Sequence, residues 1–245
     1  MSSPTQSDLS AASPHAPVTP PAPRLQLGDR LTRAEFEKRY HQMPQGIKCE
    51  LIEGQVYVMS SLVSADGHAV PHFDFITWLG NYVVSTPGVE GGDNATIRLD
   101  MDNEPQPDAF LRIKPSHGGQ STTSDDDYIE GAPELVAEIA ASIASYDLHQ
   151  KLNAYRRNSV GEYIVWRVWD QQIDWFVLRN EQFEAAQTDQ SGLFKSDVFP
   201  GLWLDPAAML SGDRGRVMEV AQQGVSSPEH QQFAEELTRK ANDEG

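Results

Sequence analysis

Two carboxylates lie inside segments that otherwise favour buried β-strands. Asp108 follows Pro107 at the start of Asp-Ala-Phe-Leu-Arg-Ile, and Glu138 lies within Leu-Val-Ala-Glu-Ile-Ala. A buried carboxylate is unfavourable unless another group compensates its charge. If the two strands are neighbours, both carboxylates converge at one edge of the sheet and require a cation between them. Mg²⁺, for which Mn²⁺ is a substitute, prefers such oxygen ligands together with water and substrate phosphate. This pair therefore predicts a metal site suited to phosphodiester hydrolysis.

Lys151 is the candidate for the lysine that would complete such a site. It follows Asp147 by four residues in a segment with helical spacing, so the two side chains share one helix face. The alternative interpretation is an exposed ion pair, which contributes at most about 0.5 kcal/mol. Asp108 also has an alternative, namely a strand-entry position that follows proline. The spacing of the residues does not decide between these interpretations.

Hydrophobic periodicity predicts an α/β protein with a mixed sheet covered by helices. We expect a Pro-, Ser- and Ala-rich disordered tail at 1–27, a single domain at 28–222 and a polar C-terminal tail or helix at 223–245. The helices expected inside the domain are 32–42, 64–84, 146–158 and 206–223. The expected strands form a hairpin around Glu53-Gly54, single strands at 95–99, 107–113 and 133–141, and an aromatic hairpin at 162–179. Residues 114–131 are expected to be a solvated loop.

Composition limits the partners and the compartment. There are 19 Lys and Arg against 36 Asp and Glu, a formal net charge of −17, so a broad basic surface for nucleic acid is excluded. Residues 139–180 are the one local exception. Arg156 and Arg157, with Arg167, are candidate phosphate contacts, and solvated helix and strand positions are the alternative. This small positive surface predicts weak, salt-sensitive DNA binding. A single cysteine, Cys49, excludes an intramolecular disulfide. With no long apolar run or export signal, we expect a cytoplasmic protein without a membrane span.

The order of several short motifs resembles the bacterial Uma-type family of putative restriction endonucleases, within the PD-(D/E)XK nuclease superfamily. The resemblance covers about three quarters of the chain. Its motifs are Glu50-Leu-Ile-Glu-Gly, Pro107-Asp108, Glu134-Leu-Val-Ala-Glu138-Ile, Tyr146-Asp-Leu-His-Gln-Lys151, Tyr155-Arg-Arg, Val160-Gly-Glu-Tyr-Ile-Val and Val198-Phe-Pro-Gly-Leu. It implies a restriction-endonuclease-like fold and a metal-dependent endonuclease that acts on DNA.

The resemblance also implies roles for single residues. Asp108 and Glu138 would be metal ligands, the backbone carbonyl of Ile139 a third ligand, and Glu50 an outer acidic residue of the site. The superfamily pattern has lysine two residues after the glutamate, where this chain has Ala140. In the Uma-type family the lysine is relocated to the following helix, which matches Lys151 with Asp147 as a supporting neighbour. The chain also has Ala141-Ser142-Ile143 in place of a Ser-Pro-Ser-like turn.

Other patterns give weaker or competing interpretations. His68-x-x-x-His72 has the spacing of a zinc pair, but Pro71 and the missing glutamate favour a surface or capping role. The hairpin tryptophans Trp166, Trp169 and Trp175 are more typical of a core or of a subunit contact than of base stacking, which is compatible with a homodimer. The rival functions are a catalytically inactive interaction protein with the nuclease fold, and a phosphoester hydrolase that acts on RNA or nucleotides.

Overall fold

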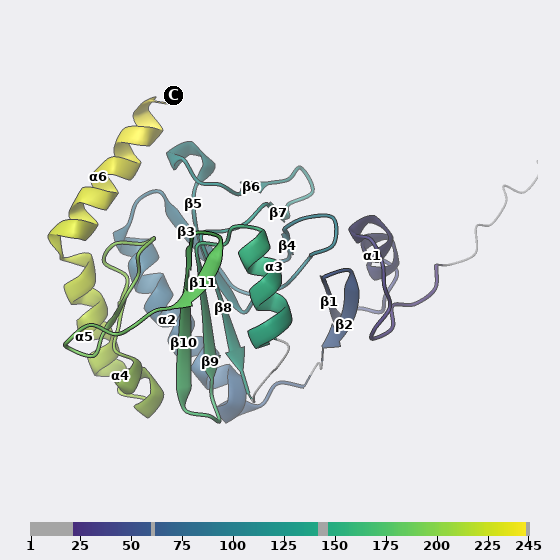
Figure 1. The fold of residues 1–245 in the computed structure, drawn as a ribbon, viewed down its shortest axis with the longest axis horizontal. Helices are drawn as coiled ribbons and strands as arrows, with labels where there is room; N and C mark the ends of the chain where they lie inside the picture. Colours follow the sequence, from purple (N-terminus) through teal and green to yellow (C-terminus); the bar gives the residue numbers. More distant parts are fainter. Residues whose placement is uncertain (1–21, 60–61, 142–146, 244–245) are drawn as a thin grey trace, which may run out of the picture.

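A six-stranded mixed sheet forms the centre of the molecule in the computed structural model, which describes residues 22–59, 62–141 and 147–243 (Figure 1). The strand order is β11-β10-β9-β8-β5-β3. β8 and β9 are parallel, and the other neighbours are antiparallel. This confirms the predicted mixed sheet. The strands are β3 (Val89–Gly92), β5 (Ala109–Ile113), β8 (Leu135–Ala140), β9 (Glu162–Arg167), β10 (Gln172–Arg179) and β11 (Gln182–Ala185).

Helices cover both faces of this sheet (Figure 1). One face packs against α2 (Val70–Ser85), α4 (Pro206–Ser211), α5 (Arg214–Val225) and α6 (Pro228–Asp243), and the other face packs against α3 (Leu152–Arg157). π-Helical turns precede two of them, η1 (Ala65–Ala69) before α2 and η3 (Asp147–Lys151) before α3. β8 is buried along its whole length because its alternate side chains enter the two different cores.

A separate hairpin stands beside the sheet and carries a small core of its own. It consists of β1 (Lys48–Ile52) and β2 (Gln55–Met59), with α1 (Arg33–Tyr40) packed against it. Glu53 and Gly54 form its two-residue turn with φ of 53° and 71°, the positive values of a type I′ turn. This confirms the predicted hairpin. Leu51 bridges to Glu104, which ties the hairpin to the segment that leads into β5.

Three features differ from the prediction. The expected loop 114–131 contains a 3₁₀ turn, η2 (Pro115–His117), and two short strands, which join β4 (Ile97–Arg98) in a second sheet: β6 (Thr122–Thr123) and β7 (Ile129–Glu130). The expected helix 206–223 is two helices, because Gly212 ends α4 with φ of 73° and Asp213 caps α5. Between the aromatic hairpin and this helix, where the sequence predicts one or two edge strands, the structure has the short antiparallel pair β12 (Phe194–Lys195) and β13 (Trp203–Leu204), which forms a sheet of its own.

The ends of the described chain carry buried side chains. Leu25 packs into the core of the β1–β2 hairpin, and α6 buries Leu237 against the main sheet. The limits 28–222 of the domain stay a prediction. Among the helices in the described ranges, none has the length and apolar character needed to cross a bilayer.

Candidate active site

Four of the residues singled out from the sequence line one cavity of about 400 Å³. Glu50 comes from β1, Asp108 directly precedes β5, Glu138 lies in β8, and Lys151 ends the turn η3. All four are buried, with exposed fractions of 0% to 7%. The antiparallel register of β5 and β8, which pairs Ala109 with Ala137, brings Asp108 alongside Glu138 at one edge of the sheet. Residues from four separate segments thus converge on one hollow.

The ammonium group of Lys151 lies between two carboxylates. Its Nζ donates hydrogen bonds to Glu138 Oε1 at 2.7 Å and to Glu50 Oε1 at 3.0 Å. Glu138 Oε1 also accepts a hydrogen bond from the Tyr155 hydroxyl at 3.2 Å. Lys151 is only 2% exposed, so a buried charge is here paired and hydrogen bonded as burial requires. The lysine reaches Glu138 from the helical segment after β8, although Ala140 occupies the usual lysine position.

Glu50 is held by the segment that enters β5. Its Oε1 accepts a hydrogen bond from the backbone N–H of Gln106 at 2.7 Å, and the Gln106 amide in turn donates to Thr96 Oγ1 at 2.9 Å. The same oxygen accepts the hydrogen bond from Lys151, so these contacts suit Glu50 to orient the ammonium group of the lysine.

Asp108 is fixed through both of its carboxylate oxygens. Oδ2 accepts the backbone N–H of Ile139 at 2.7 Å, and Oδ1 lies 3.2 Å from His68 Nε2. Burial alone would raise the pKa of Asp108, but the His68 contact, the Ile139 N–H and the charge of Lys151 together hold this pKa below its usual value. The hydrogen bond to Asp108 conversely raises the pKa of His68. Asp108 is therefore an ionised oxygen donor inside the cavity.

His68 and His72 form a clamp on Asp108, and this clamp was missed from the sequence. His72 Nε2 donates to the backbone oxygen of Asp108 at 2.9 Å, while His68 faces the carboxylate. The two rings lie one helical turn apart, at the junction of η1 and α2. The expected surface or capping role is wrong, because Nε2 of each histidine ring contacts Asp108. Their i, i+4 spacing was the available signal, and Pro71 fits the start of α2 without disturbing it.

The turn that carries His68 is itself tightly held. Ser64 Oγ accepts the backbone N–H of Gly67 at 2.8 Å and caps the turn. A Cβ atom at Gly67 would lie 2.5 Å from Ser64 Oγ and 3.0 Å from the Trp169 ring, so glycine is needed there. Trp169 thus covers this turn, whereas Trp166 and Trp175 lie in the core.

The donor set fits a hard divalent cation held by few protein ligands. Asp108 and Glu138 offer carboxylate oxygens in one cavity, with Ile139 in its wall. Within the described ranges, no three His, Cys, Asp or Glu residues form a metal-ligand cluster. A closed cage of the zinc type is thus not formed there, whereas Mg²⁺ commonly uses only one or two protein carboxylates and leaves positions to water and substrate.

Three further predicted residues lie outside this cavity or outside the description. Arg156 donates to the backbone oxygen of Glu181, and Arg157 pairs with Glu53 at 3.0 Å, so neither lines the cavity. Their role as phosphate contacts stays a prediction. The backbone of Asp147 begins η3, but its side chain lies outside the described part of the structure.

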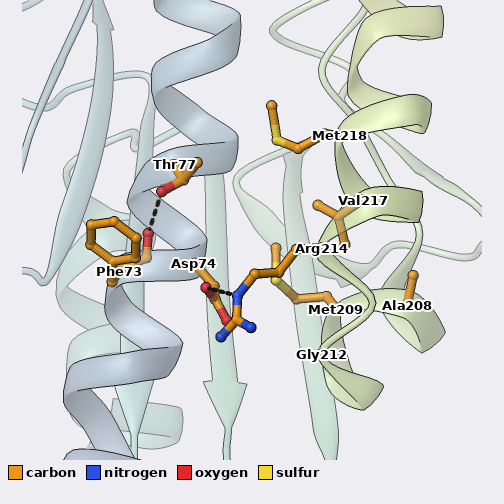
Figure 2. A pocket seen from close by; sticks show the side chains of 9 residues that line it. All are labelled: Phe73, Asp74, Thr77, Ala208, Met209, Gly212, Arg214, Val217 and Met218. Atoms are coloured by element: carbon orange, nitrogen blue, oxygen red, sulfur yellow. Dashed lines mark hydrogen bonds and ion pairs between the residues drawn. The ribbon is translucent and has the colours of Figure 1, made fainter.

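A second hollow lies between α2 and the α4–α5 segment and has a different character. Figure 2 shows its apolar lining, with one ion pair across it in which Arg214 Nε donates to Asp74 Oδ1 at 2.6 Å. The positive charge of Arg214 and the negative charge of Asp74 compensate each other. Among the described residues, no further acidic or basic side chain lines the hollow. The converging carboxylates and the buried lysine lie instead in the cavity of Asp108 and Glu138.

Comparison with known proteins gives the family of the chain and a solved structure of similar fold. The family model Uma2, described as "Putative restriction endonuclease", matches residues 34–207. The chain belongs to the Uma2 family. This Uma2 chain is also similar in fold to the crystal structure of a putative nuclease belonging to DUF820 from Anabaena variabilis, with a TM-score of 0.53 and 12% sequence identity. The match covers 70% of this chain and 97% of the other.

No curated protein matches the chain. The Uma2 assignment and the fold together support a nuclease function, and nucleases of the restriction-endonuclease-like class generally depend on a divalent metal. The stretch matched by Uma2 contains all four cavity residues and both histidines of the clamp.

Proposed function

We propose that the chain is a metal-dependent endonuclease that hydrolyses phosphodiester bonds, with DNA as the favoured substrate. The observation that carries this proposal is the buried Lys151 ammonium, 2.7 Å from Glu138, in the cavity that also holds Asp108. Carboxylate, carboxylate and lysine around one hollow are the groups that such hydrolysis requires. The Uma2 assignment supports the same reaction class.

Each residue has a distinct part in the proposed mechanism. Asp108 and Glu138 would hold Mg²⁺, with the carbonyl of Ile139 as a further ligand, and the bound ion would lower the pKa of a water and polarise the phosphate. Lys151, hydrogen bonded to its two carboxylate partners, stabilises the negative charge that develops on the phosphate oxygens. Glu50 orients Lys151 through their 3.0 Å contact.

Incubation with plasmid DNA tests this function directly. Wild-type protein is expected to nick the plasmid with Mg²⁺ or Mn²⁺ and not with EDTA. Asp108→Asn and Lys151→Met, which keep the side-chain size, are expected to lose most of this activity. Lys114→Met, at an exposed lysine that does not line the cavity, serves as a charge-matched control. Equal nicking by all proteins, or none together with a melting temperature indifferent to both metals, would overturn the proposal in favour of an inactive interaction protein.

A phosphoester hydrolase acting on RNA or nucleotides is a second candidate. It is favoured by the charge of −17, since a long duplex requires many phosphate contacts and a small substrate requires few. Rates on single-stranded DNA, duplex DNA, RNA and small phosphate esters separate the two candidates. Cytoplasmic location and a homodimer also stay predictions, and of the three hairpin tryptophans only Trp169 is exposed for a subunit contact.

A further inference from the structure

Lys48 occupies the same face of β1 as Glu50. Side chains two residues apart on a strand point to the same side, and both of these line the candidate active-site cavity. Lys48 lies at the start of β1 opposite Met59, and it is partly exposed, whereas Glu50 is fully buried. The strand thus places a carboxylate in the depth of the cavity and an ammonium group at its mouth.

The charge of Lys48 differs from most positive charges on this protein. All 19 Lys and Arg residues lie in the described ranges. Twelve of them form ion pairs with carboxylates. Lys48 is not among them, and Nζ instead donates to the neutral Asn94 Oδ1 at 3.1 Å. The basic residues among the described lining of this cavity are Lys48, His68 and Lys151. Lys151 is already held by two carboxylates, and His68 faces the carboxylate of Asp108.

Asn94 is suited to hold the lysine without neutralising it. Its backbone has φ of 51°, a left-handed conformation that asparagine tolerates better than most residues. The positive charge of Lys48 also reaches the clamp, because it acts against the rise that Asp108 causes in the pKa of His68. Lys48 therefore brings a positive charge, unpaired by any described carboxylate, into the same cavity as the carboxylate expected to bind metal.

We propose that Lys48, held by Asn94, binds a phosphate group of the substrate at the mouth of the candidate active site. This inference rests on the proposed function and adds a substrate contact to it. A phosphodiester carries one negative charge per nucleotide, and the three carboxylates of the cavity repel it. Lys48 supplies an ammonium group that has no carboxylate partner among the described residues, whereas Arg156 and Arg157 do not line the cavity.

Binding of a labelled oligonucleotide without cleavage tests the proposal. Fluorescence anisotropy in EDTA, with single strands and duplexes of about 12 nucleotides, separates binding from the metal-dependent reaction. Lys48→Met retains the length and the apolar stem of the side chain and removes its charge, and we expect binding about tenfold weaker. The slope of log affinity against log salt concentration should become shallower by about 0.9, the value for one phosphate contact. Loss of structure alone would not cause a change of this size.

Three further variants sharpen the result. Lys48→Arg is expected to restore most of the affinity and the slope. Asn94→Gly, which keeps the positive φ accessible, is expected to weaken binding to a lesser degree than Lys48→Met. Lys114→Met removes the same charge from an exposed lysine that does not line the cavity, and it should bind like the wild type.

Two outcomes would overturn the proposal and can be told apart. If the wild type binds and Lys48→Met binds equally well with an unchanged salt slope, the contact is refuted and the nuclease function is untouched. If the wild type binds neither form of the oligonucleotide and also leaves plasmid intact, both proposals fall. Melting temperatures of all variants establish that each protein is folded.

Discussion

At the scale of single residues, Lys151 has both a structural and a chemical part. Its ammonium group lies between Glu50 and Glu138, and all three side chains are nearly inaccessible. Removal of one partner from a buried ion pair leaves the opposite charge poorly compensated and destabilises by about 3–5 kcal/mol. We therefore expect Lys151→Met to lower the free energy of unfolding by about this amount in urea denaturation, in addition to its loss of nuclease activity.

A double variant separates these two effects. Glu138→Gln combined with Lys151→Met removes one negative and one positive charge, so the net charge of the buried site is the same as in the wild type. We expect this double variant to recover a large part of the lost stability and none of the activity. Recovery of nicking along with stability would show that the lysine acts only through the fold.

The His68 clamp leads to a prediction about metal affinity. Residues that orient a metal ligand typically change metal affinity by about 10- to 100-fold when they are removed. We expect His68→Ala to weaken Mn²⁺ binding, measured by isothermal titration calorimetry, by at least tenfold, because Asp108 Oδ1 loses its partner. His68→Gln, which can still donate to this oxygen, should retain more affinity. His117→Ala, on the turn η2, serves as the histidine control outside the cavity, and an equal loss there would refute the clamp.

At the scale of elements, β9 begins with a buried carboxylate outside the candidate site. Glu162 accepts hydrogen bonds from Ser196 Oγ and from the backbone N–H of Asp197, both at 2.7 Å, and so joins β9 to the segment after β12. Burial raises its pKa from 4.5 to about 7 in spite of these hydrogen bonds. The native state consequently keeps this proton to a higher pH than the unfolded chain does.

The pH dependence of stability follows from this difference. Between pH 4.5 and about 7, Glu162 binds a proton more often in the native state than in the unfolded chain. Its contribution to the free energy of unfolding is therefore fully present below pH 4.5 and is lost as the pH rises through about 7. The total change is about 3 kcal/mol. We expect the stability of Glu162→Gln relative to wild type to rise by up to this amount between pH 5 and pH 8 in urea denaturation. Glu229→Gln, on the exposed start of α6, controls for the change in net charge, and a pH-independent difference for Glu162→Gln would contradict the prediction.

Elements with strong local patterns were predictable from the sequence, and long-range placements were not. The β1–β2 hairpin has a turn that fixes its register, and β8 is apolar on both faces, so both were predicted correctly. The buried face of α2 could not be read from its apolar residues alone, because Phe73 is 70% exposed whereas Phe75 and Trp78 are buried. Helical spacing alone allows either face to be chosen in a helix with apolar residues on several sides. The contact with the sheet decides between them.

The candidate site shows the same division. Asp108 and Glu138 were recognisable because a carboxylate in an apolar strand is unusual, and Lys151 because a family resemblance indicated it. Lys48 carries no such local signal, and the i, i+4 spacing of the clamp histidines does not show which group they contact. Their importance depends on which side chains the fold brings beside them, and the contact between His68 and Asp108 spans 40 residues of sequence.

At the scale of the whole molecule, the distribution of charge limits how nucleic acid can bind. The chain carries 36 acidic residues against 19 basic ones, and most of the basic side chains are engaged in ion pairs. Among the described residues that line the cavity, Lys48 is the lysine without a carboxylate partner, and Arg156 on α3 is a second basic side chain that forms no ion pair with the described residues. Only about two phosphate contacts are therefore expected, and a longer duplex finds few further cations along the surface.

Salt titration measures this number of contacts. With about two phosphates bound, a rise from about 50 to 200 mM NaCl should weaken duplex binding only about tenfold, whereas six to ten contacts would weaken it by about 10³–10⁵. We expect duplexes of about 12 and 40 base pairs to show the same small slope once affinity is expressed per binding site. A steep slope that grows with duplex length would mean that a basic surface forms by assembly of several chains, because a single chain with this charge distribution does not present one.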